Sequence, residues 1–343
     1  MEHRNVVLAI IDAVILSVVV FLLGMAVVFA PEGGRAAVVS KECGDCHVLY
    51  PGMMKAEEGK AQNIICVNCH ASNNADTVKV LGGVKVPVVR NTVEPRMPLA
   101  GGNFYHIAAL GDRRGHNVDG ISPRDEKFGG LPPGYNRSLD PSLIGFVDSK
   151  PLTCAGANGC HGDRSKDNPF EAIRGAHHAK DAPLDGSSTA KSFRYLKITG
   201  KLKGVTGLED KDWLNVSSTK HNEYAPSMSL LCAGCHGDFH SREAVGPASP
   251  WFRHPTDVVL PKRGEYGSYK MYSPSAPVAR TSLPEAVSGQ VSAGDDVVMC
   301  LSCHFAHAGP HESLLRWDYD AVVSGEATPE GGGGCFICHA GKL

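Results

Sequence analysis

Residues 300–304 read CLSCH and residues 335–339 read CFICH, so both stretches fit the pattern Cys-x-x-Cys-His. The same pattern occurs at residues 43–47 (CGDCH), 66–70 (CVNCH) and 232–236 (CAGCH). In each motif a histidine directly follows the second of two closely spaced cysteines. The five motifs contain ten of the twelve cysteines in the 343-residue chain. They therefore decide what kind of protein the sequence describes.

The order of residues in the motif indicates its chemistry. Cys-x-x-Cys-His is the attachment sequence of c-type haem, in which two thioether bonds hold the porphyrin edge and the histidine ligates the iron. A zinc site or a disulfide gives no reason for a histidine after every second cysteine. We therefore expect covalent haem c at five sites, each named here by its proximal histidine. These histidines are His47, His70, His236, His304 and His339. The expected thioether bonds form at Cys43, Cys46, Cys66, Cys69, Cys232, Cys235, Cys300, Cys303, Cys335 and Cys338.

The two remaining cysteines lie in PLTCAGANGCHG, residues 151–162, where five residues separate Cys154 from Cys160. His161 follows Cys160, so the part of the motif that places the iron ligand is unchanged. The inserted residues Ala-Gly-Ala-Asn-Gly are small and permissive enough to bulge. A disulfide between the two cysteines is the alternative, but it leaves His161 unexplained. We expect a sixth haem here, attached through Cys154 and Cys160 and ligated by His161.

Each iron needs a second ligand on its opposite face. Nine histidines remain besides the six proximal ones and His3, enough for two histidine ligands at every low-potential iron. The candidates are His116, His177, His178, His221, His240, His254 and His307, with His106 and His311 as further possibilities. The adjacent His177 and His178 point in different directions and could ligate two haems. His307 is too close to His304 in sequence to reach the other face of the same haem, so we expect it to serve a neighbour.

An apolar segment lies near the N-terminus. Residues 6–30 contain one charge in 25 residues, and a helix of about 37 Å would cross a bilayer core of about 30 Å. The segment is longer than the apolar region of a usual signal peptide. We expect residues 1–30 to be an uncleaved membrane anchor, with a removed signal peptide as the alternative. Because c-type haem is attached after export, the haem domain would lie on the periplasmic or extracellular side of the cytoplasmic membrane.

The rest of the chain reads as short elements joined by many turns, since it is rich in glycine (39) and proline (22). Residues 77–88, TVKVLGGVKVPV, alternate around a Gly-Gly pair and predict a β-hairpin. Residues 192–199, SFRYLKIT, predict a second strand. We expect a multihaem cytochrome c fold that is loop-rich, with short α-helices carrying the motifs, minor β-structure and a haem-centred core. Three modules with two motifs each are expected at residues 31–145, 146–265 and 266–343.

The C-terminal stretch from Cys300 to His339 resembles the doubled CxxCH motif of multihaem cytochromes from metal- and sulfate-reducing bacteria. Further stretches similar to that group are GGNFYH to GHNV (101–118), CAG to GCHG (154–162), RGAHH (174–178), HNEY (221–224) and FRHPTD (252–257). The resemblance implies electron transfer through a chain of haems. It supports, as ligands, His116, His177, His178, His221, His254 and His307. The N-terminal anchor departs from the fully secreted members of the group.

These observations lead to an expected function. Six haems on one modest chain leave little polypeptide between porphyrins, so a conductive chain follows. We expect a membrane-anchored electron carrier, not an enzyme, that takes electrons from a quinol-oxidising membrane complex and passes them to periplasmic or outer-membrane cytochromes. The alternatives are a reductase of nitrite, hydroxylamine or a sulfur oxyanion, and a subunit of an extracellular haem filament in which a histidine from another subunit completes one haem. No Cys-x-x-Cys-Lys motif supports the reductase, and a net charge of −2 gives no support for nucleic-acid binding.

Overall fold

The computed structural model describes residues 63–81, 83–97, 99–135, 150–178, 184–198, 204–240, 254–322 and 333–339. The chain divides into two units, residues 1–33 and 34–343, and every described residue belongs to the second. The expected anchor and the His47 site lie outside the described residues. Within the described ranges, no helix has the length and apolar character needed to cross a membrane. The division into three modules remains a prediction.

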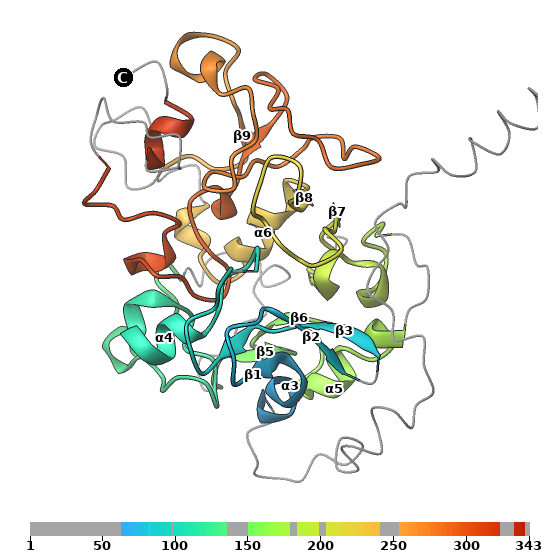
Figure 1. Cartoon of the computed structure of the whole chain (residues 1–343). Coiled ribbons are helices and arrows are strands. Elements are labelled where there is room, and N and C mark those ends of the chain that lie inside the picture. Colours follow the sequence, from blue (N-terminus) through green and yellow to red (C-terminus); the bar gives the residue numbers. More distant parts are fainter. Residues whose placement is uncertain are drawn as a thin grey trace, which may run out of the picture. The chain divides into compact units, whose positions relative to one another are not determined.

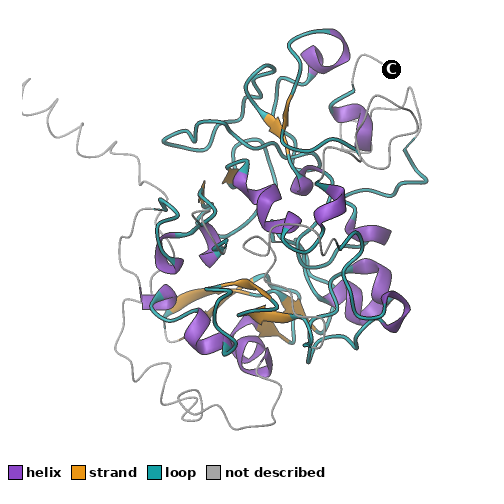
Figure 2. Cartoon of the chain, turned by 180° about the vertical axis from the view of Figure 1, so that it is seen from behind, coloured by secondary structure: helices purple, strands orange, loops and turns teal. Residues whose placement is uncertain are grey.

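The described helices are short, and most of the chain between them is loop (Figures 1 and 2). The longest, α3, has eight residues. The α-helices are α3 (Asn63–His70), α4 (Tyr105–Leu110), α5 (Pro169–Ala172) and α6 (Ser227–Ala233). The 3₁₀ helices are η2 (Asp112–Arg114), η3 (Glu126–Phe128), η4 (Ala176–His178), η5 (Thr189–Lys191), η6 (Phe193–Tyr195), η7 (Gly237–Phe239), η9 (Gly264–Ser268), η10 (Cys300–Ser302), η11 (Glu312–Leu314) and η12 (Gly334–Ile337). The expectation of a loop-rich fold with short helices is confirmed.

The strands of the described part of the chain form two-stranded sheets only. Parallel pairs join β1 (Ala71–Ser72) to β4 (Arg90–Asn91) and β5 (Thr153–Ala155) to β6 (Gly159–His161). Antiparallel pairs join β2 (Val78–Leu81) to β3 (Val84–Pro87), β7 (Gly207–Leu208) to β8 (Glu223–Tyr224) and β9 (Val258–Val259) to β10 (Val297–Val298). Such small sheets cannot form a continuous core, so the packing must come from elsewhere.

The hairpin expected at residues 77–88 is confirmed. Strands β2 and β3 pair antiparallel in the register Leu81 with Val84 and Val78 with Pro87. Pro87 lies on the last rung, where its missing N–H costs the sheet least.

The strand expected at residues 192–199 is wrong. Over its described part, Phe193–Tyr195 forms the 3₁₀ helix η6, and Leu196 only makes an isolated bridge to Gly162. Arg194 and Tyr195 adopt left-handed φ angles of 52° and 58°, which break the extended backbone that alternating side chains would otherwise favour. The cause is a tertiary contact with the His161 site, described below.

The apolar core consists of separate small clusters that border the cysteine motifs. The largest contains Phe193, Val205, Met228, Met299 and Leu301, the last two flanking Cys300. A second cluster has Cys338 and Ile337 packed against it, and a third has Cys154 and Leu152. Cysteine motifs thus lie at the margins of three of the described clusters, and the haem-centred core remains a prediction.

Candidate haem sites

Four described motifs lie on short helices, as the sequence predicts. Helix α3 carries Cys66 through His70, α6 carries Cys232, and the 3₁₀ helices η10 and η12 carry Cys300 and Cys335. In the last three motifs the histidine N–H donates to the carbonyl oxygen of the first cysteine, at 2.9 Å for His236 and 3.1 Å for His304 and His339. This helical turn brings the histidine back beside the first cysteine, which is the local geometry that haem attachment requires.

The motif with the longer spacing has a different local structure. Cys154 lies on β5 and Cys160 on β6, and the two strands pair in parallel through a tight loop. Gly156 makes this loop possible, since its φ is 98° and a Cβ there would come within 2.9 Å of the Lys166 carbonyl oxygen. The five-residue spacer is therefore a bulge that returns Cys160 and His161 beside the first cysteine's strand. No disulfide joins Cys154 to Cys160.

Every described proximal histidine uses Nδ1 for a hydrogen bond. A carbonyl or carboxylate oxygen only accepts, so Nδ1 carries the hydrogen and the neutral ring keeps the Nε2 lone pair for a metal. This is the usual arrangement of histidine ligands. The acceptors are the carbonyl oxygens of Pro87 for His70 (2.9 Å), Arg194 for His161 (2.8 Å), Pro133 for His236 (2.7 Å) and Ser313 for His304 (2.8 Å), and Oε1 of Glu265 for His339 (2.6 Å). The residues present therefore fit haem c.

Burial favours the neutral form of four of these rings. It lowers the pKa of His70, His161, His236 and His304 below the usual value. Among histidines outside the motifs, burial lowers the pKa of His116 to about 4 and that of His307 to about 3. A neutral imidazole is the form that ligates iron, so these environments suit ligands at physiological pH.

Four proximal histidines each face a second histidine ring from a distant part of the chain. A metal–imidazole bond is about 2 Å long and the ring centre lies about 1 Å behind the nitrogen, so two axial imidazoles place their centres about 6 Å apart. The observed pairs match this spacing. They are His70 with His177 (6.2 Å), His161 with His307 (6.2 Å), His236 with His116 (6.1 Å) and His339 with His254 (6.2 Å). His307 faces a neighbouring site and not that of His304, as the sequence predicts.

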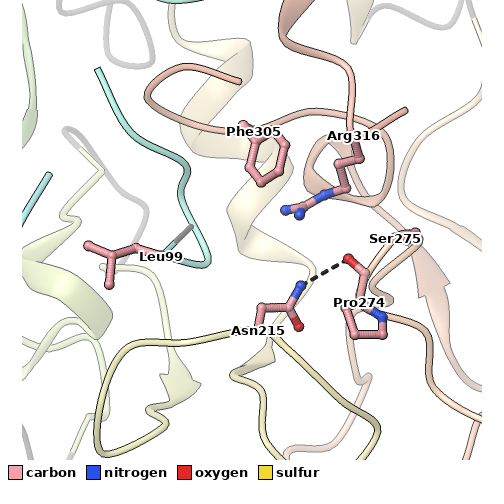
Figure 3. A pocket seen from close by; sticks show the side chains of 6 residues that line it. All are labelled: Leu99, Asn215, Pro274, Ser275, Phe305 and Arg316. Atoms are coloured by element: carbon pink, nitrogen blue, oxygen red, sulfur yellow. Dashed lines mark hydrogen bonds between the residues drawn. The ribbon is translucent and has the colours of Figure 1, made fainter. Parts of the chain in front are cut away.

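His304 differs from the other described proximal histidines. Among the residues that the structure describes, no second histidine ring faces it at this spacing. A pocket of about 150 Å³ lies beside the His304 motif. Two of its lining residues contact the motif directly: Phe305 follows His304 in the chain, and the Arg316 backbone N–H donates to the Cys303 carbonyl oxygen. Figure 3 shows its lining, in which Asn215 donates to the Pro274 carbonyl oxygen across 3.0 Å and the Arg316 guanidinium lies 4.5 Å from the ring centre of Phe305.

The other candidate ligands have different surroundings. His221 is fully buried and stacks on the Tyr272 ring at 3.5 Å, with its Nε2 3.3 Å from Glu223. His240 contacts Asp257 through Nε2 at 2.7 Å. His106 and His311 face no proximal histidine at the pair spacing within the described ranges, and the side chain of His178 lies outside the described part. The sequence candidates therefore include the four histidines whose rings face a proximal histidine, but sequence reasoning could not separate these four from the others.

Cysteines of successive motifs approach one another. The thiols of Cys66 and Cys154 form a hydrogen bond that lowers the pKa of Cys66 and raises that of Cys154. A hydrogen bond with Cys300 likewise raises the pKa of Cys232 well above its usual value. Burial raises the pKa of Cys160 to about 11, with a further contribution from nearby Cys235. Burial also raises the pKa of Cys303 to about 12, with a further contribution from nearby Cys335. The five described sites thus form one series, from His70 through His161, His236 and His304 to His339.

Comparisons with known proteins match the cysteine motifs of the chain. Residues 290–343 match the family model of the doubled CXXCH motif. The chain is 22% identical to the C-type cytochrome OmcS of Geobacter sulfurreducens, over 84% of this chain and 81% of OmcS. The chain is a multihaem c-type cytochrome with doubled CxxCH motifs. The cytochrome carries haem c and transfers electrons.

Two solved structures also align with the cytochrome. One is the outer membrane cytochrome S filament from Geobacter sulfurreducens, with 18% identity, coverage of 75% of each chain and a TM-score of 0.43. The other is the cryo-EM structure of the OmcS nanowires from the same organism, with 20% identity, coverage of 80% of this chain and 82% of that chain, and a TM-score of 0.43.

Proposed function

We propose that this cytochrome is a subunit of an extracellular haem filament and conducts electrons through six haems that each have two histidine ligands. Similarity to OmcS along most of both chains supports this proposal over the membrane-anchored carrier that the sequence first favoured. The continuous series of cysteine motifs supports conduction, because electron tunnelling between haems is fast only at short range.

The observation that carries the filament proposal is the contrast between His304 and the other described proximal histidines. Four of them face a second ring at 6.1 to 6.2 Å, whereas His304 faces none among the described residues. A histidine from a second subunit would complete this haem. Assembly would then create the last ligand bond and continue the electron path from one subunit to the next.

The proposed ligand pairs within one subunit follow the ring geometry: His70 with His177, His161 with His307, His236 with His116 and His339 with His254. We further propose that His178 serves a different haem from His177, as its adjacent position suggests. No haem is assigned to His221, because its ring is stacked on Tyr272 and its Nε2 faces Glu223.

The test joins mass spectrometry, electron microscopy and spectroscopy on the purified full chain. The expected mass corresponds to six haems, and it also reports whether residues 1–30 have been removed. Filaments should be visible by negative stain. Dissociated subunits should contain one five-coordinate, high-spin haem that becomes low-spin when filaments form. Subunits that remain entirely low-spin, or that never assemble, would contradict the filament proposal.

The membrane-anchored carrier remains the second candidate, supported by the apolar segment at residues 6–30. It predicts that the mass of the purified protein includes these residues and that the protein fractionates with the cytoplasmic membrane. Quinol-oxidising complexes would then be its electron donors.

A further inference from the structure

Arg164 is a buried cation beside two haem sites. It follows His161 by three residues and lies in the turn between β6 and α5. Only 6% of its surface is exposed, and its Nε has no hydrogen-bond partner. Its Nη2 donates to Sγ of Cys235 at 3.5 Å. The side chain thus reaches from the His161 motif to the His236 motif.

Within the described part of the chain, no carboxylate oxygen lies within 4.0 Å of a guanidinium nitrogen of Arg164. No ion pair there compensates its charge. The neighbouring Asp163 is engaged elsewhere, since it accepts from the Ser165 N–H at 3.0 Å and lies 3.9 Å from Lys197. A guanidinium keeps its proton at physiological pH. Burying an unpaired ion is strongly destabilising, so a functional reason for Arg164 is required.

The Arg164 side chain lies beside both the His161 motif and the His236 motif. Arg164 lies four residues after Cys160, in the turn that follows β6, and its Nη2 lies 3.5 Å from Sγ of Cys235. Arg164 is therefore close to the second cysteines of the His161 and His236 sites at once. Both cysteines are expected thioether positions, so the guanidinium would lie beside the attachment points of both haems.

We propose that Arg164 is a fixed positive charge at the junction of the His161 and His236 haems and raises the reduction potential of both. This inference rests on the proposed six-haem chain. A ferric haem carries one more positive charge than a ferrous haem, so a nearby cation favours the reduced form. The effect is strong here because a buried charge is screened little by salt.

Potentiometric titration of the fully loaded cytochrome, followed by visible absorption, tests the proposal. Arg164→Gln should shift two of the haems to lower potential, whereas Arg164→Lys, which keeps the charge, should shift them much less. Arg113→Gln is the matched control, since it removes the same charge from a side chain that is 78% exposed. A shift of one haem, of none, or of all haems uniformly in Arg164→Gln would overturn the proposal.

A measurement on the wild-type protein covers the case in which Arg164→Gln fails to fold. A cryo-EM map of the haem-loaded protein should show the guanidinium between the two thioether edges without a carboxylate within hydrogen-bond distance. A haem propionate paired with Arg164 would cancel the charge and overturn the inference. A wild-type mass of five haems would instead contradict the six-haem function, so the two failures can be told apart.

Discussion

The imidazole of His161 donates through Nδ1 to the carbonyl oxygen of Arg194 across 2.8 Å, although 33 residues separate them. The next N–H, of Gly162, donates to the carbonyl oxygen of Tyr195 at 2.6 Å. The same pair of bonds occurs at His304, whose Nδ1 and following N–H bind the carbonyl oxygens of Ser313 (2.8 Å) and Leu314 (2.8 Å). The acceptor residues are left-handed in both places, with φ between 52° and 59°. Backbone strain is therefore concentrated where it orients an expected iron ligand.

Ser313 tests whether this strained backbone supports the His304 site. Ser313→Pro restricts φ to about −65° and should displace the carbonyl oxygen, at a cost of at least about 2 kcal/mol in unfolding free energy. Ser313→Gly keeps the left-handed conformation and should stay within about 1 kcal/mol of wild type. Chemical denaturation measures both variants. Equal stability of the two would show that the left-handed carbonyl has no supporting role.

His307 tests the pairing of distal ligands. His307→Ala should leave the iron of the His161 site five-coordinate, so that one haem becomes high-spin and binds carbon monoxide. The physical reason is that His307 provides the ring 6.2 Å from His161. Magnetic circular dichroism and carbon monoxide difference spectra provide the measurement. His311→Ala is the matched control and should leave the spin state of every haem unchanged; the reverse result would reassign the ligand.

Gly102 tests how the segment that carries His307 docks. Gly102 has a φ of 83°, and a Cβ there would overlap the carbonyl oxygen of Ala308. Gly129 has a left-handed φ of 59° but open space around it. Alanine at either position incurs the left-handed penalty of about 1 kcal/mol, but only Gly102→Ala should add a packing cost of about 1–3 kcal/mol. Comparing unfolding free energies isolates the contact with Ala308, and similar losses in both variants would argue against it.

Glu265 tests the contribution of a carboxylate to one haem. His339 donates to Glu265, whereas the other described proximal histidines donate to backbone carbonyl oxygens. A carboxylate acceptor makes the imidazole more basic and stabilises ferric iron. Glu265→Gln should therefore raise the reduction potential of one haem. A tenfold change in this one-electron equilibrium would appear as a shift of about 60 mV.

Potentiometric titration measures this shift, with the exposed Glu312→Gln as the charge-matched control. Unchanged potentials in Glu265→Gln would mean that the carboxylate does not tune this haem.

Sequence spacing predicts the cysteine and histidine motifs better than it predicts the distant residues that contact them. The five Cys-x-x-Cys-His motifs and the bulge between Cys154 and Cys160 are local, so a few consecutive residues specify them. The strand expected at residues 192–199 fails because Arg194 and Tyr195 turn their carbonyl oxygens toward the His161 motif, a contact between distant segments. His221 was a reasonable ligand candidate from sequence, but its stacking on Tyr272 depends on residues far along the chain.

By itself, the sequence determined the cofactor class and predicted the attachment cysteines and proximal histidines, because covalent haem attachment depends on the order of neighbouring residues. Only the tertiary structure decided which distant histidine faces four of the described proximal histidines, which carbonyl or carboxylate oxygen accepts each described Nδ1 hydrogen bond, and that Arg164 is buried against Cys235. These relationships join residues tens to hundreds of positions apart. Their geometry is set by how short elements pack together, which local spacing does not encode.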